Sequence, residues 1–311
     1  MRYKIRGKSL AASICVGVAV LLTYAVIGRS QGEEDLLALV KEGSKNASAS
    51  IRSGRGKITV HGWRLDKNGG VHESETASTV IFVGDHYKMS TVETVLENTS
   101  GLGADEKRLL TPPGTVLCEE VSYDGNAVTV YYPDKKSANI FSKDQAASYW
   151  RPISPESCGF TDLSKADCRT RRETVGGVDY IVVDIAERNL TPDTTNFTVS
   201  SRRYIDPAKG FTMTRLLVYG RNDEHKENVL LDEKNVEVRD YGGGLFGPGK
   251  CKSESYRPNK TGEIQKAMSR VVTYDPEFQL NVPISDSELK LILPSGTGVY
   301  DETTDEHYTV Q

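Results

Sequence analysis

The amino-acid sequence predicts a mainly β fold of the α+β class, built on a strongly curved antiparallel sheet with few helices. Beyond Gly54, apolar and polar residues alternate with a period of two in one segment after another, which is the pattern of half-buried strands. Turn sequences such as residues 66–70 (DKNGG) separate these segments. Strands do not alternate with helices as a parallel sheet would require, so we expect about ten antiparallel strands.

One segment has helical periodicity. From Glu33 to about Ile51, leucine and valine recur at helical spacing, with acidic residues in the first turn and lysines further on. This arrangement of charges suits the helix dipole. We therefore expect one helix over residues 33–51, with an apolar stripe that must be buried against the sheet.

The remaining elements follow from alternation and turn signals. The segment 142–176, with Pro152 and Pro155, is predicted to be an insertion, and the glycine- and proline-containing segment 242–262 a surface loop. Alternating leucines at 289, 291 and 293 predict a last hairpin. The first strand is expected around Ile58 and Val60, and the others at residues 78–83, 86–96, 127–132, 180–186, 197–205, 211–219 and 229–239.

The first 29 residues have the pattern of an export signal. Four basic residues precede Ser9, and no charged residue occurs from Ser9 to Gly28. Twenty uncharged residues in a helix span about 30 Å, the thickness of a membrane core. Both a cleaved signal peptide and an uncleaved signal anchor fit residues 1–29, and we favour the anchor. Residues 30–311 are then exported, as a periplasmic domain tethered to the inner membrane.

Charge and cysteine content limit the partners. Five of the 39 basic residues and none of the 43 acidic ones precede residue 30, so the exported part has 34 basic and 43 acidic residues, a net charge of −9. This charge disfavours nucleic acid as a partner. Cys158 and Cys168 flank a short polar segment, which in an oxidising compartment predicts a disulfide between them. Whether Cys118 and Cys251 also pair is left open by the sequence.

Signatures of catalysis, metal binding and cofactor binding are missing. The sequence has no nucleophile elbow, no H-E-x-x-H motif, no phosphate-binding loop and no dinucleotide fingerprint. The five histidines are scattered among polar residues. We therefore expect no catalytic residue, no metal and no cofactor, and we interpret the protein as a non-enzyme.

Five segments together resemble a known family. They are GRGKITV (54–60), YIDPAKGF (204–211), TRLLVY (214–219), NVPI (281–284) and LPSGTGVYD (293–301), after an export signal and an amphipathic helix. In this order they resemble the outer-membrane lipoprotein-sorting (LolA-like) superfamily of periplasmic proteins, over residues 33–97 and 178–301. The resemblance implies a half-open β-barrel whose concave face is closed by helices and holds acyl chains. The cysteine-bearing segment 142–176 and the greater length depart from that pattern.

The resemblance gives the leading functional expectation, which is a non-catalytic periplasmic module that binds lipid or lipoprotein acyl chains. The alternative is an envelope-sensing regulatory protein of similar fold, with an inner-membrane protein as its partner, because fold alone does not separate the two. Alternation combined with the resemblance predicts which apolar residues line the cavity. They are Val60, Phe82, Met89, Met213 and Leu217.

Overall fold

The structure, a computed structural model, describes residues 32, 35–47, 49–66, 69–99, 111–143, 167–187, 198–221, 227–259 and 261–311. An N-terminal helix covers residues 35–47 and continues at 49–50, as predicted from its periodicity. The strands of the first half of the chain are β1 (Ser53–Leu65), β2 (Val71–Val83), β3 (His86–Thr99), β4 (Val116–Tyr123), β5 (Ala127–Tyr132) and β6 (Ser137–Ser142).

The second half of the chain forms a second run of strands. These are β7 (Asp167–Val175), β8 (Val178–Glu187), β9 (Thr198–Asp206), β10 (Thr212–Arg221), β11 (Glu227–Asp240), β12 (Phe246–Pro258) and β13 (Ile264–Tyr274). The C-terminal part adds β14 (Gln279–Leu280), the helix α3 (Asp286–Leu289), β15 (Gly298–Asp301) and β16 (Glu306–Thr309). Two short 3-10 turns, η1 (Pro133–Lys135) and η2 (Pro207–Lys209), connect neighbouring strands.

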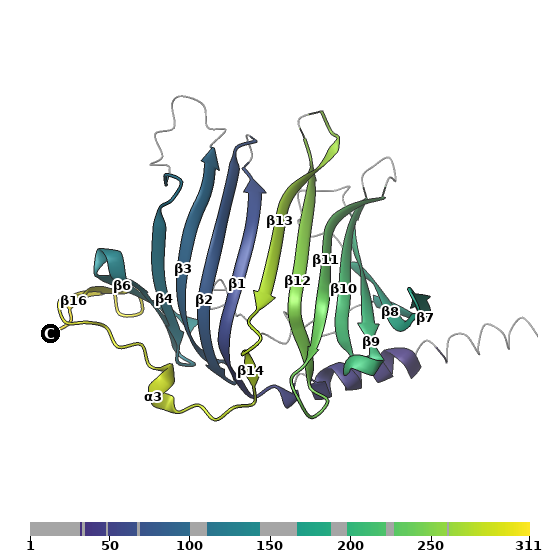
Figure 1. Ribbon diagram of the computed structural model, residues 1–311, viewed down its shortest axis with the longest axis horizontal. Helices are drawn as coiled ribbons and strands as arrows, with labels where there is room; N and C mark the ends of the chain where they lie inside the picture. Colours follow the sequence, from purple (N-terminus) through teal and green to yellow (C-terminus); the bar gives the residue numbers. More distant parts are fainter. Residues whose placement is uncertain are drawn as a thin grey trace, which may run out of the picture.

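All these strands belong to one sheet, in the order β16-β15-β6-β5-β4-β3-β2-β1-β13-β12-β11-β10-β9-β8-β7, and β14 pairs with β1 (Figure 1). Each half of the chain is an antiparallel meander, and the two meanders join where β1 pairs with β13. The junction holds seven residue pairs, from Ile58 opposite Tyr274 to Arg64 opposite Met268. The middle of the sheet is thus made by segments about two hundred residues apart.

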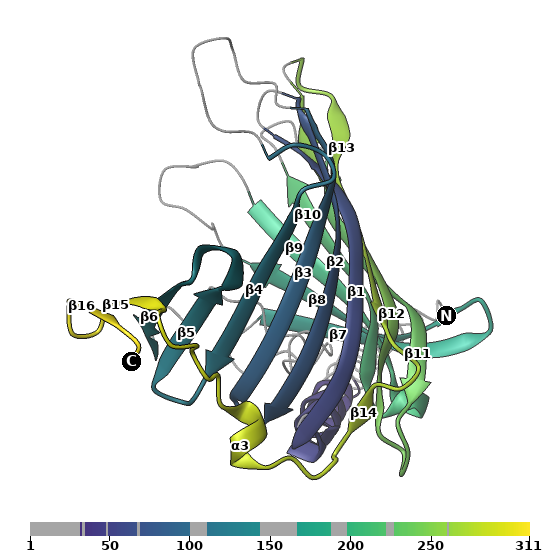
Figure 2. The ribbon, with the colours of Figure 1, turned by 60° about the vertical axis from the view of Figure 1, so that its left-hand side comes forward.

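The sheet is bent and open, which confirms the predicted fold class. In Figure 2 the two meanders lie on either side of one concave face, and the N-terminal helix is at the lower end of that face. Among the described strands, β16 and β7 are the two edges of the sheet. β15 is parallel to β6, whereas the other strand pairs are antiparallel.

The N-terminal helix covers the β8–β9 side of the concave face. Its residue Val40 is fully buried against a group of branched side chains from these two strands. They are Ile181, Val183, Ile185 and Ile205. Leu36 and Leu37 of the helix pack against the same cluster. The apolar stripe read from the sequence therefore faces the sheet, as an amphipathic helix on a half-covered sheet requires.

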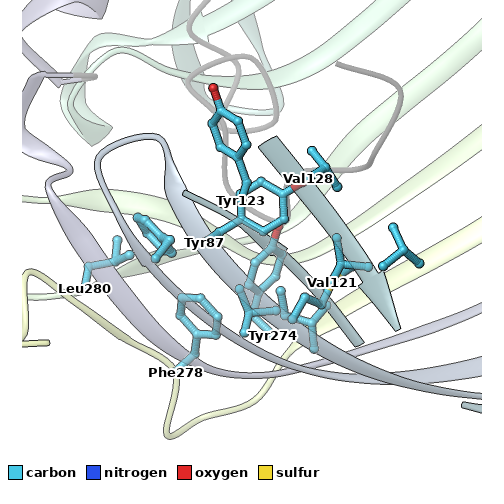
Figure 3. Close-up of a cluster of buried hydrophobic side chains, with 12 residues drawn as sticks. Tyr87, Val121, Tyr123, Val128, Tyr274, Phe278 and Leu280 are labelled. Carbon is cyan, nitrogen blue, oxygen red and sulfur yellow. The ribbon is translucent and has the colours of Figure 1, made fainter. Parts of the chain in front are cut away.

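A larger cluster fills the β1–β5 side of the concave face. Its members come from β1 to β5, from the end of β13 and from the segment that follows it, as Figure 3 shows for its labelled side chains. The ring of Phe278 meets that of Tyr274 edge-on, with centroids 5.4 Å apart. The buried members are Ile58, Val80, Phe82, Tyr87, Met89, Val121, Tyr123, Val128, Val130, Tyr274, Phe278 and Leu280.

The turn at residues 206–210 places an aromatic ring on the helix. The buried side chain of Asp206 accepts a hydrogen bond of 3.0 Å from the Ala208 amide, and Gly210 takes a left-handed φ of 60°. Phe211 follows with a φ of 61°. Its ring lies so close to the helix that a Cβ atom at Gly43 would be 2.3 Å from it. Glycine at position 43 is therefore required for this packing.

Three segments differ from their predicted structure. Residues 246–258, expected to belong to a surface loop, form the central strand β12, because β11 and β13 supply hydrogen-bonding partners on both sides of it. Its glycines and Pro248 lie next to a register shift, where a strand tolerates them. Residues 167–175, expected within the insertion, form the edge strand β7. In place of the hairpin expected around Leu289, Leu291 and Leu293, the chain forms α3 and an irregular segment.

We predict that Gly43→Ala destabilises the protein by about 1–3 kcal/mol, because the added methyl group overlaps the Phe211 ring. Helix propensity alone predicts the opposite, a gain of about 1 kcal/mol. Urea unfolding of the full chain measures the difference. In a Phe211→Ala background the same change should cost nothing, since the ring is gone. A stabilised Gly43→Ala single variant would contradict the packing described here.

Candidate functional site

The strand register separates the side chains into two faces. Residues paired directly across neighbouring strands point to the same side of a sheet. The row that runs from Gly62 through Arg270, Ser253, Glu233, Leu216 and Arg203 to Val183 lies on the concave face, because Val183 packs against the helix. Asp184, Arg202 and Asp232 lie in the alternating row on the convex face.

A hollow lies on the concave face, across β13, β1, β2, β3 and β4, next to the larger cluster. It has a volume of about 390 Å³, within the range of small-molecule sites. We call it the concave pocket. Its lining residues are Val60, Gly62, Trp63, Arg64, His72, Ser74, Thr76, Ser78, Met89, Thr91, Glu93, Glu119, Met268, Ser269 and Arg270.

The pocket combines apolar and hydroxyl-bearing surfaces. Val60, Met89 and Met268 contribute its apolar part. Ser74, Thr76 and Ser78 form a row of hydroxyl groups along β2. The Ser78 oxygen lies 3.1 Å from the hydroxyl oxygen of Thr91 on β3. The pocket is therefore amphipathic, in contrast to the purely apolar cavity that the five predicted lining residues describe.

Two carboxylates form one wall of the pocket. Glu93 lies on β3 and Glu119 on the adjacent strand β4. Burial raises the pKa of Glu119, and the nearby charge of Glu93 raises it further. Nε2 of His72 lies 3.7 Å from a carboxylate oxygen of Glu93. Within the described residues Glu119 has no salt bridge or hydrogen bond, so no opposite charge neutralises its half-buried carboxylate.

Positive side chains form the opposite wall. Arg64 lies on β1, and Arg270 projects from β13 beside it.

Burial raises the pKa of Glu233 on β11, whereas the charge of Arg270 lowers it. Burial also raises the pKa of the neighbouring Cys251 thiol to about 12, with the charge of Glu233 acting in the same direction and that of Arg270 against it. Cys251 is thus a protonated thiol at neutral pH.

The predicted lining residues fall into three groups. Val60 and Met89 line the concave pocket. Phe82 is in the larger cluster, with 5% of its surface exposed, and does not reach the pocket lining. Met213 is paired with Ile205 of the concave face. Whether any of the five binds a ligand stays a prediction.

Leu217 lies on the convex face, so the expectation that it shares a side with Met213 is wrong. A register shift between Met213 and Arg215 adds one residue to β10 and reverses the alternation beyond it. Leu217 is paired with Arg202 on one side and with Asp232 on the other. It is buried to 6% exposure among the charged side chains of the convex face.

The convex face is stabilised by ion pairs that cross several strands. Asp184 contacts both Arg171 and Arg202, and Asp232 contacts both Arg215 and Lys234. Further along the sheet, Glu254 contacts Lys252 at 2.9 Å and Lys266 at 2.7 Å. From β7 to β13 the charges of this face therefore disfavour a purely apolar ligand.

The carboxylates and arginines of the pocket were missed by sequence reasoning. Alternation along β3 could have placed Met89, Thr91 and Glu93 on one side. No sequence signal, however, shows that β13 lies beside β1, which is what brings Arg270 to the pocket.

The remaining sequence predictions concern residues partly outside the described ranges. Residues 1–29, the predicted export segment, lie outside them. In the part of the chain that is described, no helix is long and apolar enough to cross a membrane. The described residues contain no disulfide and no cluster of three metal-ligand side chains. Cys158, the predicted partner of Cys168, lies outside them. Cys118 and Cys251 lie on opposite faces of the sheet and do not meet.

We predict that Glu119→Gln stabilises the protein at about pH 8 but not at about pH 4. The pKa of Glu119 is raised above its ordinary value of 4.5, so the folded state binds the proton more tightly than the unfolded chain does. Stability is then lost as the pH rises through the raised pKa, and glutamine abolishes that loss. Urea midpoints at the two pH values measure it.

The matched control is Glu120→Gln, because Glu120 is the next residue of β4 and lies on the convex face. It should show no such pH-dependent gain. A gain of equal size at both pH values, or none for Glu119→Gln, would contradict the burial of this carboxylate.

Comparisons with known proteins give low similarities. No family model and no curated protein matches the chain. It is similar to the solved structure of a DUF1329 family protein from Desulfovibrio piger, with 12% identity, a TM-score of 0.40 and coverage of 81% of this chain and 96% of that one. It is also similar to a LolA superfamily protein from Nitrosomonas europaea, with 12% identity, a TM-score of 0.41 and coverage of 82% and 97%. The strand pairing of this chain shows one open curved sheet with a helix on its concave face.

Proposed function

We propose that this protein is a non-catalytic binding protein of the cell envelope that holds a lipid-like amphiphile, or the acyl part of a lipoprotein, on its concave face. The observation that carries the proposal is the concave pocket, which adjoins the larger apolar cluster and combines apolar side chains with polar ones. A molecule with an apolar chain and a polar head matches this combination of surfaces.

Burial of the chain would supply most of the binding free energy, at about 0.8 kcal/mol for each methylene group removed from water. Val60, Met89 and Met268 offer the apolar surface for it. The hydroxyl row of β2 offers hydrogen bonds to the polar end. With a volume of about 390 Å³, the pocket has room for a head group and the first part of a chain.

The contacts of the pocket residues support binding rather than catalysis. The Ser78 oxygen is 3.1 Å from that of Thr91, and His72 lies beside Glu93. A nucleophilic hydroxyl group would be hydrogen-bonded to its general base. Among the described pocket residues, no serine or threonine hydroxyl group is hydrogen-bonded to His72.

The predicted export segment supports a location outside the cytoplasm for this function. A fusion of alkaline phosphatase after residue 60 should be active, because that enzyme needs an oxidising compartment. An inactive phosphatase fusion at this junction would contradict export.

We predict that Thr76→Phe weakens the binding of a fluorescent acyl probe to the full chain by at least about tenfold. Thr76 lines the pocket in the middle of β2, so a benzyl group there occupies the space of the ligand. Titration of the probe, followed by its fluorescence, measures the dissociation constant.

Thr79→Phe is the matched control, since Thr79 lies on the same strand and points to the convex face, opposite Lys57. Probe affinity should change by less than about twofold in this variant. Failure of the unmodified protein to bind the probe, or equal losses in both variants, would contradict binding in the concave pocket.

A further inference from the structure

The concave pocket has opposite charges on opposite walls. Glu93 and Glu119 stand on β3 and β4, and Arg64 and Arg270 stand on β1 and β13. From β13 to β3 there are three strand spacings, or about 14 Å between backbones. The glutamate and arginine side chains extend from these backbones over a concave surface. The distance between their charged ends is therefore shorter, and comparable with the length of a small zwitterionic group. The pocket is therefore electrically dipolar.

The carboxylate wall is suited to a cation. Glu119 is half-buried, stands next to a second carboxylate and has no salt bridge within the described residues. Partial removal of a carboxylate from water is costly unless an opposite charge compensates for it. His72 contacts Glu93 only at 3.7 Å and leaves Glu119 uncompensated. An ammonium group between the two carboxylates would supply the missing charge.

The guanidinium wall is suited to an anion. No salt bridge or hydrogen bond of the Arg64 side chain occurs within the described residues, and this side chain is exposed at the pocket. Arg270 stands two pairs further along the β1–β13 junction, opposite Gly62, and also lines the pocket; its charge acts on Glu233 as well. Two guanidinium groups present donors in the fork geometry that phosphate oxygens accept.

The two walls together select a head group that carries both charges. We propose that the concave pocket binds the zwitterionic head of an amphiphile, with its amine against Glu93 and Glu119 and its phosphate against Arg64 and Arg270. The chain attached to the head then lies along Val60, Met89 and Met268. This inference rests on the proposed function and specifies which amphiphiles the pocket takes.

Three soluble probes separate head from chain. Dihexanoyl phosphatidylethanolamine has both charges and short chains, dihexanoyl phosphatidylglycerol has the same chains without the amine, and glycerophosphoethanolamine has the head without chains. Calorimetric titration of the full chain, below the micelle concentration of the lipids, gives the three dissociation constants. We expect the ethanolamine lipid to bind at least about tenfold more tightly than either of the other two.

Variants test which wall of the pocket causes the preference for the ethanolamine lipid over the glycerol lipid. Glu119→Gln should reduce the preference for ethanolamine over glycerol lipid to less than about threefold, whereas Glu120→Gln, on the convex face of the same strand, should leave it unchanged. Arg64→Gln should weaken both lipids by a similar factor, because both carry the phosphate. If Glu119→Gln kept the full preference for the ethanolamine lipid, the assignment of the amine to the carboxylate wall would be overturned.

The outcomes distinguish this inference from the proposed function. Equal binding of the two lipids, with loss of both in Thr76→Phe, would overturn the zwitterionic head and leave amphiphile binding intact. Glycerophosphoethanolamine bound as tightly as the lipid would overturn the role of the chain. Absence of binding for all three probes, together with absence of binding of the acyl probe, would overturn both.

Discussion

The pairing of β1 with β13 is the constraint on which the rest of the structure depends. It joins two antiparallel meanders, each of which forms from local hairpins, into one sheet. The pairing also fixes which side chains of the two halves share a face, because a slip of one residue would invert every side chain of one meander. The concave pocket exists only in this register, since Val60, Arg64, Met268 and Arg270 meet across it.

The side chains on the two faces of the sheet are stabilised in different ways. Ion pairs such as Asp184–Arg202 and Arg215–Asp232 lie on the convex face of β8 to β11, where water and opposite charges satisfy the side chains. On the concave face, the N-terminal helix covers β8 and β9, and aromatic packing fills the lower part of β1–β5. On β4, next to the aromatic cluster, the carboxylate of Glu119 remains half-buried and has no salt bridge within the described residues. A half-buried charge that the protein itself does not compensate is a candidate for binding.

Local signals predicted the local structure well. The helix over residues 33–51, the strand β5 at residues 127–132 and the turn at 206–210 agree with the structure because periodicity, turn residues and a capping aspartate determine them. β12 was missed because both of its faces are polar and its glycines and proline resemble a loop. The side of Leu217 was wrong because a single extra residue in β10 reverses alternation without any sequence signal. The charged walls of the pocket depend on strand order, which alternation does not encode.

Photocrosslinking tests the central claim, ligand binding on the concave face, most directly. The full chain would be irradiated with a phosphatidylethanolamine that carries a photoreactive group in its acyl chain, and the adducts would be mapped by peptide mass spectrometry. We expect saturable adducts on the peptides that contain Val60, Met89 and Met268. Adducts found only at convex-face residues such as Leu217 would contradict binding on the concave face. Adducts whose yield does not saturate with lipid concentration would contradict it as well.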